Sequence, residues 1–250
     1  MACAATSLAL TGCAATSGGT SSSLLSKSKI ASASLTQTEI ASGLKEALNI
    51  GIKTGIKTLA TNNGYYDDLA TRIGLPPEAQ IITKNVAKLP GGQALVTKVV
   101  KNINAAASDA ASKAVPIFTT ALTSMTISDA KTILTSKGQA ATDYFKGKTK
   151  TPLKKLFGSY IDNSVKKKII GDVSAQSCWN TMTSQWNEVA TSTVGKVAGF
   201  TTVKTDLTDY LTDKAVDGIY YKVGEQEKKI RTDTSARTTA LLKKVFAHQS

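Results

Sequence analysis

Apolar residues return every three or four positions through most of the chain, and the first long segment shows this most clearly. Large aliphatic residues occur at intervals of four between residues 36 and 60, at Ile40, Leu44, Leu48, Ile52 and Ile56. A stripe of small residues runs beside them, at Gly43, Ala47, Gly51 and Gly55. Each glycine costs about 1 kcal/mol of helix propensity relative to alanine. We therefore expect a helix here, with another chain segment packed closely against its small residues.

The same periodicity predicts further helices along the chain. The predicted helical segments are 36–60, 93–114, 117–125, 126–134, 152–165, 206–231 and 236–246. Pro152 is expected to begin its helix, because proline suits the first helical turn. Thr234 or Ser235 is expected to cap the last helix, since a hydroxyl can accept a hydrogen bond from a free backbone N–H.

Capping residues support two of these helix starts. Thr36 and Glu39 have the spacing of a capping box, and Thr126 precedes a short helix that carries Asp129 at its third position.

Within residues 172–202, two tryptophans seven positions apart share one helix face, and we expect them to pack into the core. No segment shows sustained strand alternation. The pattern therefore predicts an all-α protein with a single multi-helix, bundle-like domain over residues 35–247.

Residues 1–34 differ in composition from the predicted domain. They are rich in Ala, Ser, Thr and Gly and carry no charge before Lys27. The sequence Leu10-Thr11-Gly12-Cys13 resembles a bacterial lipobox, in which Cys13 would be acylated, although no Lys or Arg precedes it as in a secretory signal. We expect either a signal remnant with a lipoprotein tether or a disordered tail. The first alternative predicts export to the periplasm or anchoring at the outer membrane. The sequence contains no run of eighteen apolar residues, so no transmembrane helix is predicted.

Few residues offer catalytic or metal-binding chemistry. The single histidine is His248, the third residue from the end of the sequence, which disfavours triads and histidine-built metal sites. Cys178 is isolated from Cys3 and Cys13, and a buried structural thiol is the simplest interpretation. We accordingly expect no catalytic residue and no cofactor.

Positive charge is concentrated in the middle of the chain. The formal net charge is +13, and residues 131–168 contain many lysines and only two acids, Asp143 and Asp162. The candidate anion-binding residues are Lys146, Lys148, Lys150, Lys154, Lys155, Lys166, Lys167, Lys168, Lys228, Lys229, Arg231 and Arg237. The alternative is a solvated surface that keeps the protein soluble, with the C-terminal cations placed favourably near helix C-termini.

Acidic residues form one stripe in the predicted helix 206–231. Asp209, Asp213 and Asp217 are spaced by four and share a helix face. Such a stripe is a weak candidate for a hard cation, which prefers oxygen ligands. The alternative is an acidic face that pairs with the basic region 146–168 within the fold.

Several segments resemble one known family. They include Ala114-Val-Pro-Ile-Phe118, Ala140-Ala-Thr-Asp-Tyr-Phe145, Glu227-Lys-Lys-Ile-Arg231 and Ala236-Arg-Thr-Thr-Ala-Leu-Leu-Lys-Lys-Val-Phe246. Over residues 34–247 the chain resembles the bacterial domain of unknown function 4197. That resemblance implies an exported helical protein with no assigned activity.

These features favour a non-catalytic helical protein of the cell envelope that binds an anionic or apolar partner. The binding region would be a basic helical surface or a groove between helices, and the partner an anionic membrane surface or another envelope protein. The alternative is a structural or self-assembling protein, for which an oligomer is expected; an enzyme that uses carboxylates is a third hypothesis. Nucleic-acid binding is disfavoured, because no zinc finger, RNA-recognition signature or aromatic stacking platform occurs.

Overall fold

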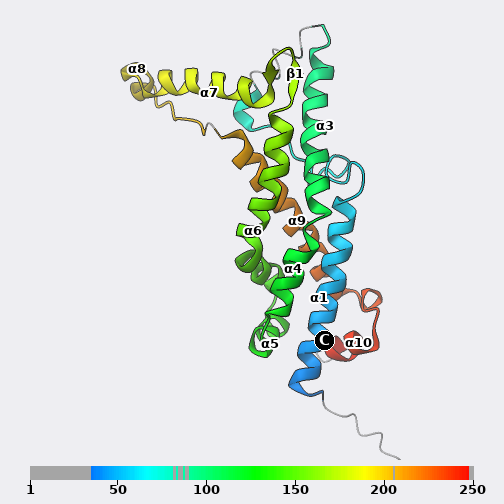
Figure 1. The fold of residues 1–250 in the computed structure, drawn as a ribbon. Coiled ribbons are helices and arrows are strands. Elements are labelled where there is room, and N and C mark those ends of the chain that lie inside the picture. The colour runs from blue at the N-terminus through cyan, green and yellow to red at the C-terminus, as the bar shows by residue number, and fades with distance from the viewer. Residues whose placement is uncertain (1–34, 81–82, 84–86, 88–89, 205, 248–250) are drawn as a thin grey trace, which may run out of the picture. The chain divides into compact units, whose positions relative to one another are not determined.

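Long helices lie side by side and form a bundle (Figure 1). In this computed structural model the described residues are 35–80, 83, 87, 90–204 and 206–247. The bundle is built on α1 (Gln37–Leu59), α3 (Gly92–Ala111), α6 (Ala140–Val165) and α9 (Leu207–Thr232). Helix α9 packs against α1 and α6, and α6 also packs against α3. The predicted all-α class is confirmed, whereas Cys13, the segment 1–34 and His248 lie outside the described residues.

Helix α1 begins and packs as its sequence pattern predicts. The Thr36 side chain accepts a hydrogen bond from the Glu39 backbone N–H, and the Glu39 carboxylate accepts one from the Thr36 backbone. A Cβ added to Gly55 would lie 3.0 Å from the carbonyl oxygen of Lys222 on α9. One added to Gly43 would lie 2.8 Å from Val245 Cγ2 on α10 (Ala240–Ala247). The expected close packing against the small residues is therefore confirmed at these two positions.

Shorter elements connect the long helices. A 3-10 turn, η1 (Pro77–Ala79), precedes α3, and α4 (Val115–Thr123) follows it with Pro116 in its first turn. Next comes α5 (Ile127–Thr135), whose start is fixed by a capping box between Thr126 and Asp129. Among the described residues, no helix is both long enough and apolar enough to cross a membrane.

The expectation that Pro152 begins a helix is wrong, because α6 runs unbroken from Ala140 to Val165. Proline removes one backbone N–H and therefore frees the carbonyl one turn earlier, at Lys148. Both Lys148 and Pro152 are exposed, so this face of the helix is open to water. Thr149 and Leu153 on the adjacent face are fully buried and hold the helix against the bundle. Packing on both sides of Pro152 thus maintains one continuous helix.

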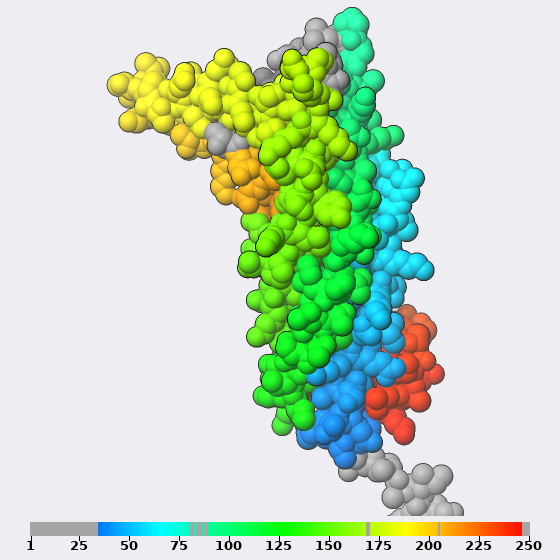
Figure 2. Space-filling model, in the orientation of Figure 1, coloured from blue at the N-terminus to red at the C-terminus, as the bar shows by residue number. Residues whose placement is uncertain are grey.

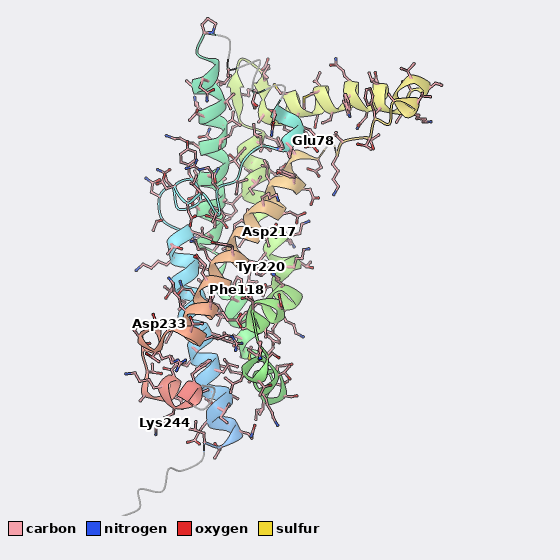
Figure 3. All side chains as sticks on the ribbon, turned by 180° about the vertical axis from the view of Figure 1, so that it is seen from behind. Glu78, Phe118, Asp217, Tyr220, Asp233 and Lys244 are labelled. Atoms are coloured by element: carbon pink, nitrogen blue, oxygen red, sulfur yellow. The ribbon has the colours of Figure 1, made fainter. Side chains whose placement is uncertain are left out.

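Aromatic side chains fill the centre of the bundle. The ring of Phe118 on α4 meets the rings of Phe145 on α6 and Tyr220 on α9 edge to face, with centroids 5.6 and 6.2 Å apart. Figure 3 shows Phe118 and Tyr220 together in the middle of the bundle. Tyr65 is fully buried and its hydroxyl donates to the Ala215 carbonyl at 2.7 Å. Burial raises the pKa of Tyr65 well above its ordinary value.

The segment 168–203 departs most from its prediction. It begins with a small antiparallel hairpin, β1 (Lys168–Ile170) and β2 (Val173–Ser174), which the absence of alternation did not predict. Then α7 (Ala175–Thr191) and α8 (Thr193–Val197) extend away from the bundle (Figure 2). These two helices and the segment that follows them, up to Val203, are called the arm.

The expectation that both tryptophans pack into the core is wrong for one of them. Trp179 is 4% exposed and belongs to the core, but Trp186 is 37% exposed. The helix that carries both residues, α7, extends away from the bundle (Figure 1). The indole of Trp186 instead lies against Phe200, with ring centroids 5.2 Å apart. Cys178, expected to be a buried thiol, is exposed.

The two C-terminal helices form as predicted, but the last one begins at Ala240 and not at residue 236. Residues 234–236 form the 3-10 turn η2 (Thr234–Ala236), so neither Thr234 nor Ser235 caps the last helix. Thr239 does so, because its hydroxyl accepts a hydrogen bond from the Leu242 N–H at 3.2 Å. Helix α10 then packs against α1.

Candidate functional site

Two aspartates of the predicted metal stripe are held by a lysine from the neighbouring helix. Nζ of Lys154 on α6 lies 2.9 Å from a carboxylate oxygen of Asp209 and 2.9 Å from one of Asp213. The hydrogen bonds that Lys154 donates to Asp213 and Asp209 raise the pKa of Lys154, and the bond to Asp209 lowers the pKa of that carboxyl. Pairing with the basic region, the alternative interpretation, is confirmed for these two aspartates. Asp217 is exposed, and the described residues contain no group of three or more metal-ligating side chains.

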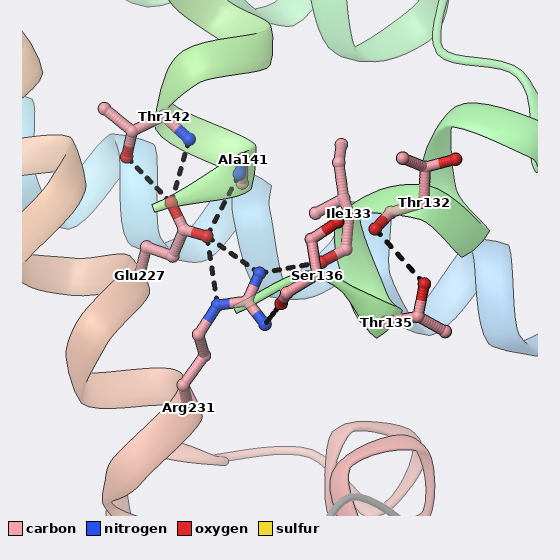
Figure 4. Close-up of polar contacts among 8 residues, drawn as sticks. All are labelled: Thr132, Ile133, Thr135, Ser136, Ala141, Thr142, Glu227 and Arg231. Atoms are coloured by element: carbon pink, nitrogen blue, oxygen red, sulfur yellow. Dashed lines mark hydrogen bonds and ion pairs between the residues drawn. The ribbon is translucent and has the colours of Figure 1, made fainter. Parts of the chain in front are cut away.

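A buried carboxylate closes the N-terminus of α6 (Figure 4). Glu227 on α9 accepts hydrogen bonds from the backbone N–H groups of Ala141 and Thr142 at 3.0 and 2.8 Å, and from the Thr142 hydroxyl at 2.8 Å. The first N–H groups of a helix lack partners within the helix, so an acceptor from another element stabilises them. The side chain of Glu227 is 3% exposed and is ion-paired with Arg231 at 2.9 Å. This pair therefore links α9 to the N-terminus of α6, and we call it the Glu227–Arg231 joint.

Two of the candidate anion-binding arginines are engaged at helix ends inside the protein. Arg231 donates to the carbonyls of Ile133 and Ser136 at the end of α5, at 2.8 and 3.2 Å (Figure 4). Arg237 is 8% exposed and donates to the carbonyls of Ile230 and Arg231 at the end of α9, at 3.1 and 3.0 Å. Cations near helix C-termini satisfy free carbonyls and oppose the helix dipole. These contacts agree with the alternative interpretation of the C-terminal cations.

Most of the other candidate lysines lie on open surfaces. The exposed members away from the end of α6 are Lys146, Lys148, Lys150, Lys155, Lys228 and Lys229. Lys146 is 3.4 Å from an oxygen of Asp143 within the same helix, and the ammonium of Lys148 lies 5.9 Å from the ring centre of Tyr144. Exposed pairs of this kind contribute little to stability. These lysines mainly set the charge of the surface.

A groove between α3 and α6 brings together lysines from distant parts of the sequence. Lys98 on α3 lines it with Lys167 and Lys168, which directly follow α6. Asn102 and Ser164 complete the lining, and the Ser164 hydroxyl donates to the Asn102 carbonyl at 3.1 Å. The narrow part has a volume of about 30 Å³ and adjoins a wider hollow of about 240 Å³. The narrow part, which Lys98 lines, has room for little more than a water molecule, whereas the wider hollow, which Lys167 also lines, can admit a phosphate-sized group.

The charge of this groove comes from two cations without an acidic partner. Lys168 is ion-paired with Asp172, and nearby Lys166 is paired with Asp162 at 2.7 Å. Within the described residues, no acidic side chain pairs with Lys98 or Lys167. The wider hollow also contains the hydroxyl of Tyr160 and the amide of Asn163, together with the carboxylate of Asp109. Ammonium, amide and hydroxyl donors together suit a phosphate or another oxyanion.

Sequence reasoning identified Lys167 and Lys168 but missed Lys98. Lys98 lies outside the basic block, in a helix recognised mainly for its apolar face. Its position on the polar side of that helix could be inferred from the periodicity. Its proximity to the end of α6 depends on how α3 and α6 pack, which periodicity does not determine.

The second candidate surface lies on the arm. Nine large apolar or aromatic side chains of the described residues are exposed, and five of them lie between positions 186 and 200. These five are Trp186, Val189, Val194, Val197 and Phe200. A hollow of about 550 Å³ lies beside α7 and is lined by Met182, Trp186, Val189 and residues 201–203. Clustered exposed apolar groups of this kind are typical of an interaction surface.

The fold and these surfaces define an all-helical protein with a basic groove and a projecting apolar arm. The chain belongs to the family described as Protein of unknown function (DUF4197), whose model matches residues 34–247. The resemblance inferred from the sequence is thereby confirmed. No curated protein and no solved structure matches the chain at a significant level.

Proposed function

We propose that this protein is a non-catalytic component of the bacterial cell envelope that binds the phosphate groups of an anionic membrane surface. Binding takes place at the groove between α3 and α6. The observation that carries this proposal is the pair Lys98 and Lys167, which line one groove without an acidic partner in the described structure. Phosphate oxygens bind favourably to ammonium groups flanked by amide and hydroxyl donors.

Long-range electrostatics support the same partner. Two of the lysines, Lys27 and Lys29, precede the helical domain, so the rest of the chain carries a formal charge of +11. A positively charged surface is attracted to the negative potential of anionic lipids, by about 1 kcal/mol for each lysine or arginine near the surface. The lysines outside the groove, such as Lys146, Lys150 and Lys155, strengthen this attraction without providing a specific site.

The envelope location is supported by the sequence before the helical domain. Small residues and Leu10 precede Cys13 in the manner of a lipobox, and the Ser- and Gly-rich stretch that follows is typical of a flexible tether. Acylation at Cys13 would hold the helical domain near a membrane, where even weak headgroup binding is effective because the local concentration is high. Measuring the intact mass of the protein purified from its native membrane tests this part. An unmodified Cys13 still preceded by Met1 contradicts it.

Vesicle co-sedimentation tests the groove. The full chain is mixed with neutral vesicles or with vesicles that contain an anionic phospholipid, over a series of salt concentrations. The K98Q/K167Q variant is compared with K53Q/K57Q, which removes the same charge from exposed positions on α1. We expect K98Q/K167Q to lower binding to anionic vesicles by about tenfold or more, and K53Q/K57Q to have a smaller effect. Binding should also weaken as salt screens the attraction.

Three results contradict the proposal. They are equal binding to neutral vesicles, equal losses in the two variants, and the absence of vesicle binding. A parallel titration with inorganic polyphosphate identifies the source of the anion. If polyphosphate binds and depends on Lys98 and Lys167 while vesicles do not bind, the partner is an acidic polymer and the membrane proposal is wrong.

A further inference from the structure

We propose that two copies of this chain associate through antiparallel pairing of α7, with the two-fold axis at Met182. This inference does not depend on the proposed function, because it concerns the arm and not the α3–α6 groove. It gives the exposed apolar residues of the arm a specific partner.

The first observation is the spacing of the residues on one side of α7. Ala175, Cys178, Met182, Trp186 and Val189 follow at intervals of three, four, four and three, so they form one stripe along the helix. Cys178, Trp186 and Val189 are exposed, while Ala175 and Met182 are partly buried. The buried residues Trp179, Thr183 and Ala190 lie on the adjoining side, and Trp186, seven residues after Trp179, lies at the boundary between the two. The stripe therefore lies beside the contact that α7 makes with its own chain.

The second observation is that this stripe is symmetric about its centre. Cys178 and Trp186 each lie four residues from Met182, and Ala175 and Val189 each lie seven residues from it. In an antiparallel pair centred on Met182, a small residue of one helix is opposite a large one of the other. Cys178 meets Trp186, and Ala175 meets Val189. A two-fold interface requires such self-complementarity, in which each contact occurs twice.

The third observation is the shape of the surface beside the stripe. The hollow of about 550 Å³ is lined on α7 by Met182, Trp186 and Val189 together with the polar residues Thr183 and Gln185, and it is bordered by residues 201–203 and by Glu78 of η1. Trp186 is fixed at its edge, since its indole N–H donates to the Thr201 carbonyl at 2.9 Å and its ring lies against Phe200. Side chains of a second helix can enter this hollow, because helices pack by fitting ridges into grooves.

Charge favours pairing of two copies through the arm over pairing through the lysine-rich surfaces of the bundle. The helical domain carries a large positive charge, so two copies repel each other wherever lysines face one another. Residues 173–203 contain one acidic residue and one basic residue, Glu188 and Lys196, and the hollow beside α7 adds one further carboxylate, Glu78, and no lysine or arginine. Because the arm extends away from the bundle (Figure 2), pairing through α7 brings near-neutral surfaces together.

The size of the surface sets the expected strength. Helix α7 has 17 residues, which corresponds to a length of about 25 Å. A pair of such helices buries a few hundred Å² on each copy, roughly half of the approximately 800 Å² that a standard interface buries per partner. We therefore expect a reversible dimer that forms at micromolar or higher concentration.

Cysteine cross-linking tests the geometry. The full chain is prepared with C3S, C13S and C178S, and M182C or S184C is added to this background. Position 182 lies on the proposed axis, whereas Ser184 is exposed on the opposite side of α7. Under mild oxidation we expect M182C to give a disulfide-linked dimer and S184C to remain monomeric. Equal cross-linking of the two variants, or cross-linking of neither, overturns the proposal.

The direction of pairing is tested with two further variants. With native Cys178 retained in the C3S/C13S background, W186C places two thiols opposite each other in an antiparallel pair and should cross-link efficiently. W186C together with C178S should cross-link poorly, because its thiols lie on opposite sides of the axis. Efficient cross-linking in the C178S background indicates a parallel pair and contradicts the proposed arrangement.

Sedimentation equilibrium then tests the apolar contact without a covalent bond. V189E adds a charge within the stripe, and V197E makes the same change at a more exposed valine of α8. A charge buried without a partner opposes association strongly, so V189E should weaken dimerisation by about tenfold or more. V197E should have little effect. The proposal is overturned if the native protein is monomeric at all concentrations. It is also overturned if V197E weakens dimerisation more than V189E does, which indicates that the tip of the arm binds the partner. Vesicle binding by K98Q/K167Q is measured separately, so failure of either proposal is distinguishable.

Discussion

The bundle and the arm are both amphipathic helices, yet they bury their apolar faces to different degrees. In the bundle, large side chains such as Phe118 and Phe145 are completely buried between helices. In the arm, Trp186 and Phe200 pack mainly against each other and remain partly exposed. The same periodicity in the sequence therefore leads to a core where several helices converge and to a surface where one helix extends alone. An apolar stripe indicates where a partner is needed, whether within the chain or outside it.

The largest difference between the two regions is expected from phenylalanine truncation. Phe118→Ala removes a fully buried ring that contacts Phe145 and Tyr220, and should lower the free energy of unfolding by about 4 kcal/mol. Phe200→Ala removes a half-exposed ring and should cost about 1 kcal/mol or less. Urea denaturation followed by circular dichroism measures both. Similar losses would mean that the arm is as firmly packed as the bundle.

Removal of a buried charge should have the next largest effect. Glu227→Ala leaves Arg231 without its ion-pair partner and frees the N–H groups at the start of α6, which should cost about 3 kcal/mol. Glu188→Ala changes the same side chain at an exposed position of the arm and should alter stability by less than about 0.5 kcal/mol. The unfolding midpoints in urea provide the comparison. A small effect at Glu227 would show that water replaces the carboxylate at the helix end.

Glycine substitutions separate the inner and outer faces of the bundle itself. Gly55→Ala places a Cβ 3.0 Å from the Lys222 carbonyl and should destabilise the protein by about 1 to 2 kcal/mol. Gly147→Ala lies in α6 with no heavy atom within 4 Å of the new Cβ, and should stabilise the protein by about 1 kcal/mol. Thermal unfolding measures both changes. If Gly55→Ala is also stabilising, α1 and α9 can separate slightly without cost.

The smallest expected effect is the acid sensitivity of the bundle. The pKa of Asp209 is lowered by its hydrogen bond to Lys154, and that of Asp68 by its hydrogen bond to Lys222. A lowered pKa in the folded state stabilises the fold above the ordinary carboxyl pKa, and this contribution is lost as pH falls through the folded value. The urea concentration at the unfolding midpoint of the native protein should therefore decrease as the pH is lowered below about 4.

The Asp209→Asn variant isolates this contribution. It should show a smaller decrease between pH 6 and pH 3 than the native protein, and Asp217→Asn provides a control at an exposed position of the same helix. Identical acid dependence of the native protein and Asp209→Asn would contradict the assigned role of the Lys154 contact.

Much of the bundle could be predicted from the sequence because local patterns determine it. The stripe of Gly43, Gly51 and Gly55 predicted close helix packing, and the Thr36 and Thr126 caps predicted two helix starts. Pro152 shows the limit of such reasoning. A local helix-breaking signal was overridden by burial of Thr149 and Leu153 on either side of it, which depends on tertiary structure.

The candidate surfaces could be predicted only in part. Composition identified Lys167 and Lys168, but Lys98 joins them through the packing of α3 on α6. Arg231 and Arg237 carry the same formal charge as those lysines, and hydrogen bonds to helix ends engage them inside the protein. Spacing placed Trp179 and Trp186 on one helix face, but it contains no information on where α7 leaves the bundle.

The joint formed by Glu227 and Arg231 has a consequence for the order of assembly. The carboxylate that closes α6 lies 85 residues after Thr142, and the guanidinium that closes α5 lies 98 residues after Ile133. During synthesis at about 5 to 20 residues per second, the corner between α5 and α6 therefore waits several seconds for its closing groups. A nascent chain that ends before α9 lacks both the carboxylate that binds the start of α6 and the guanidinium that binds the end of α5. These contacts in the middle of the protein therefore form only after its C-terminal part has emerged.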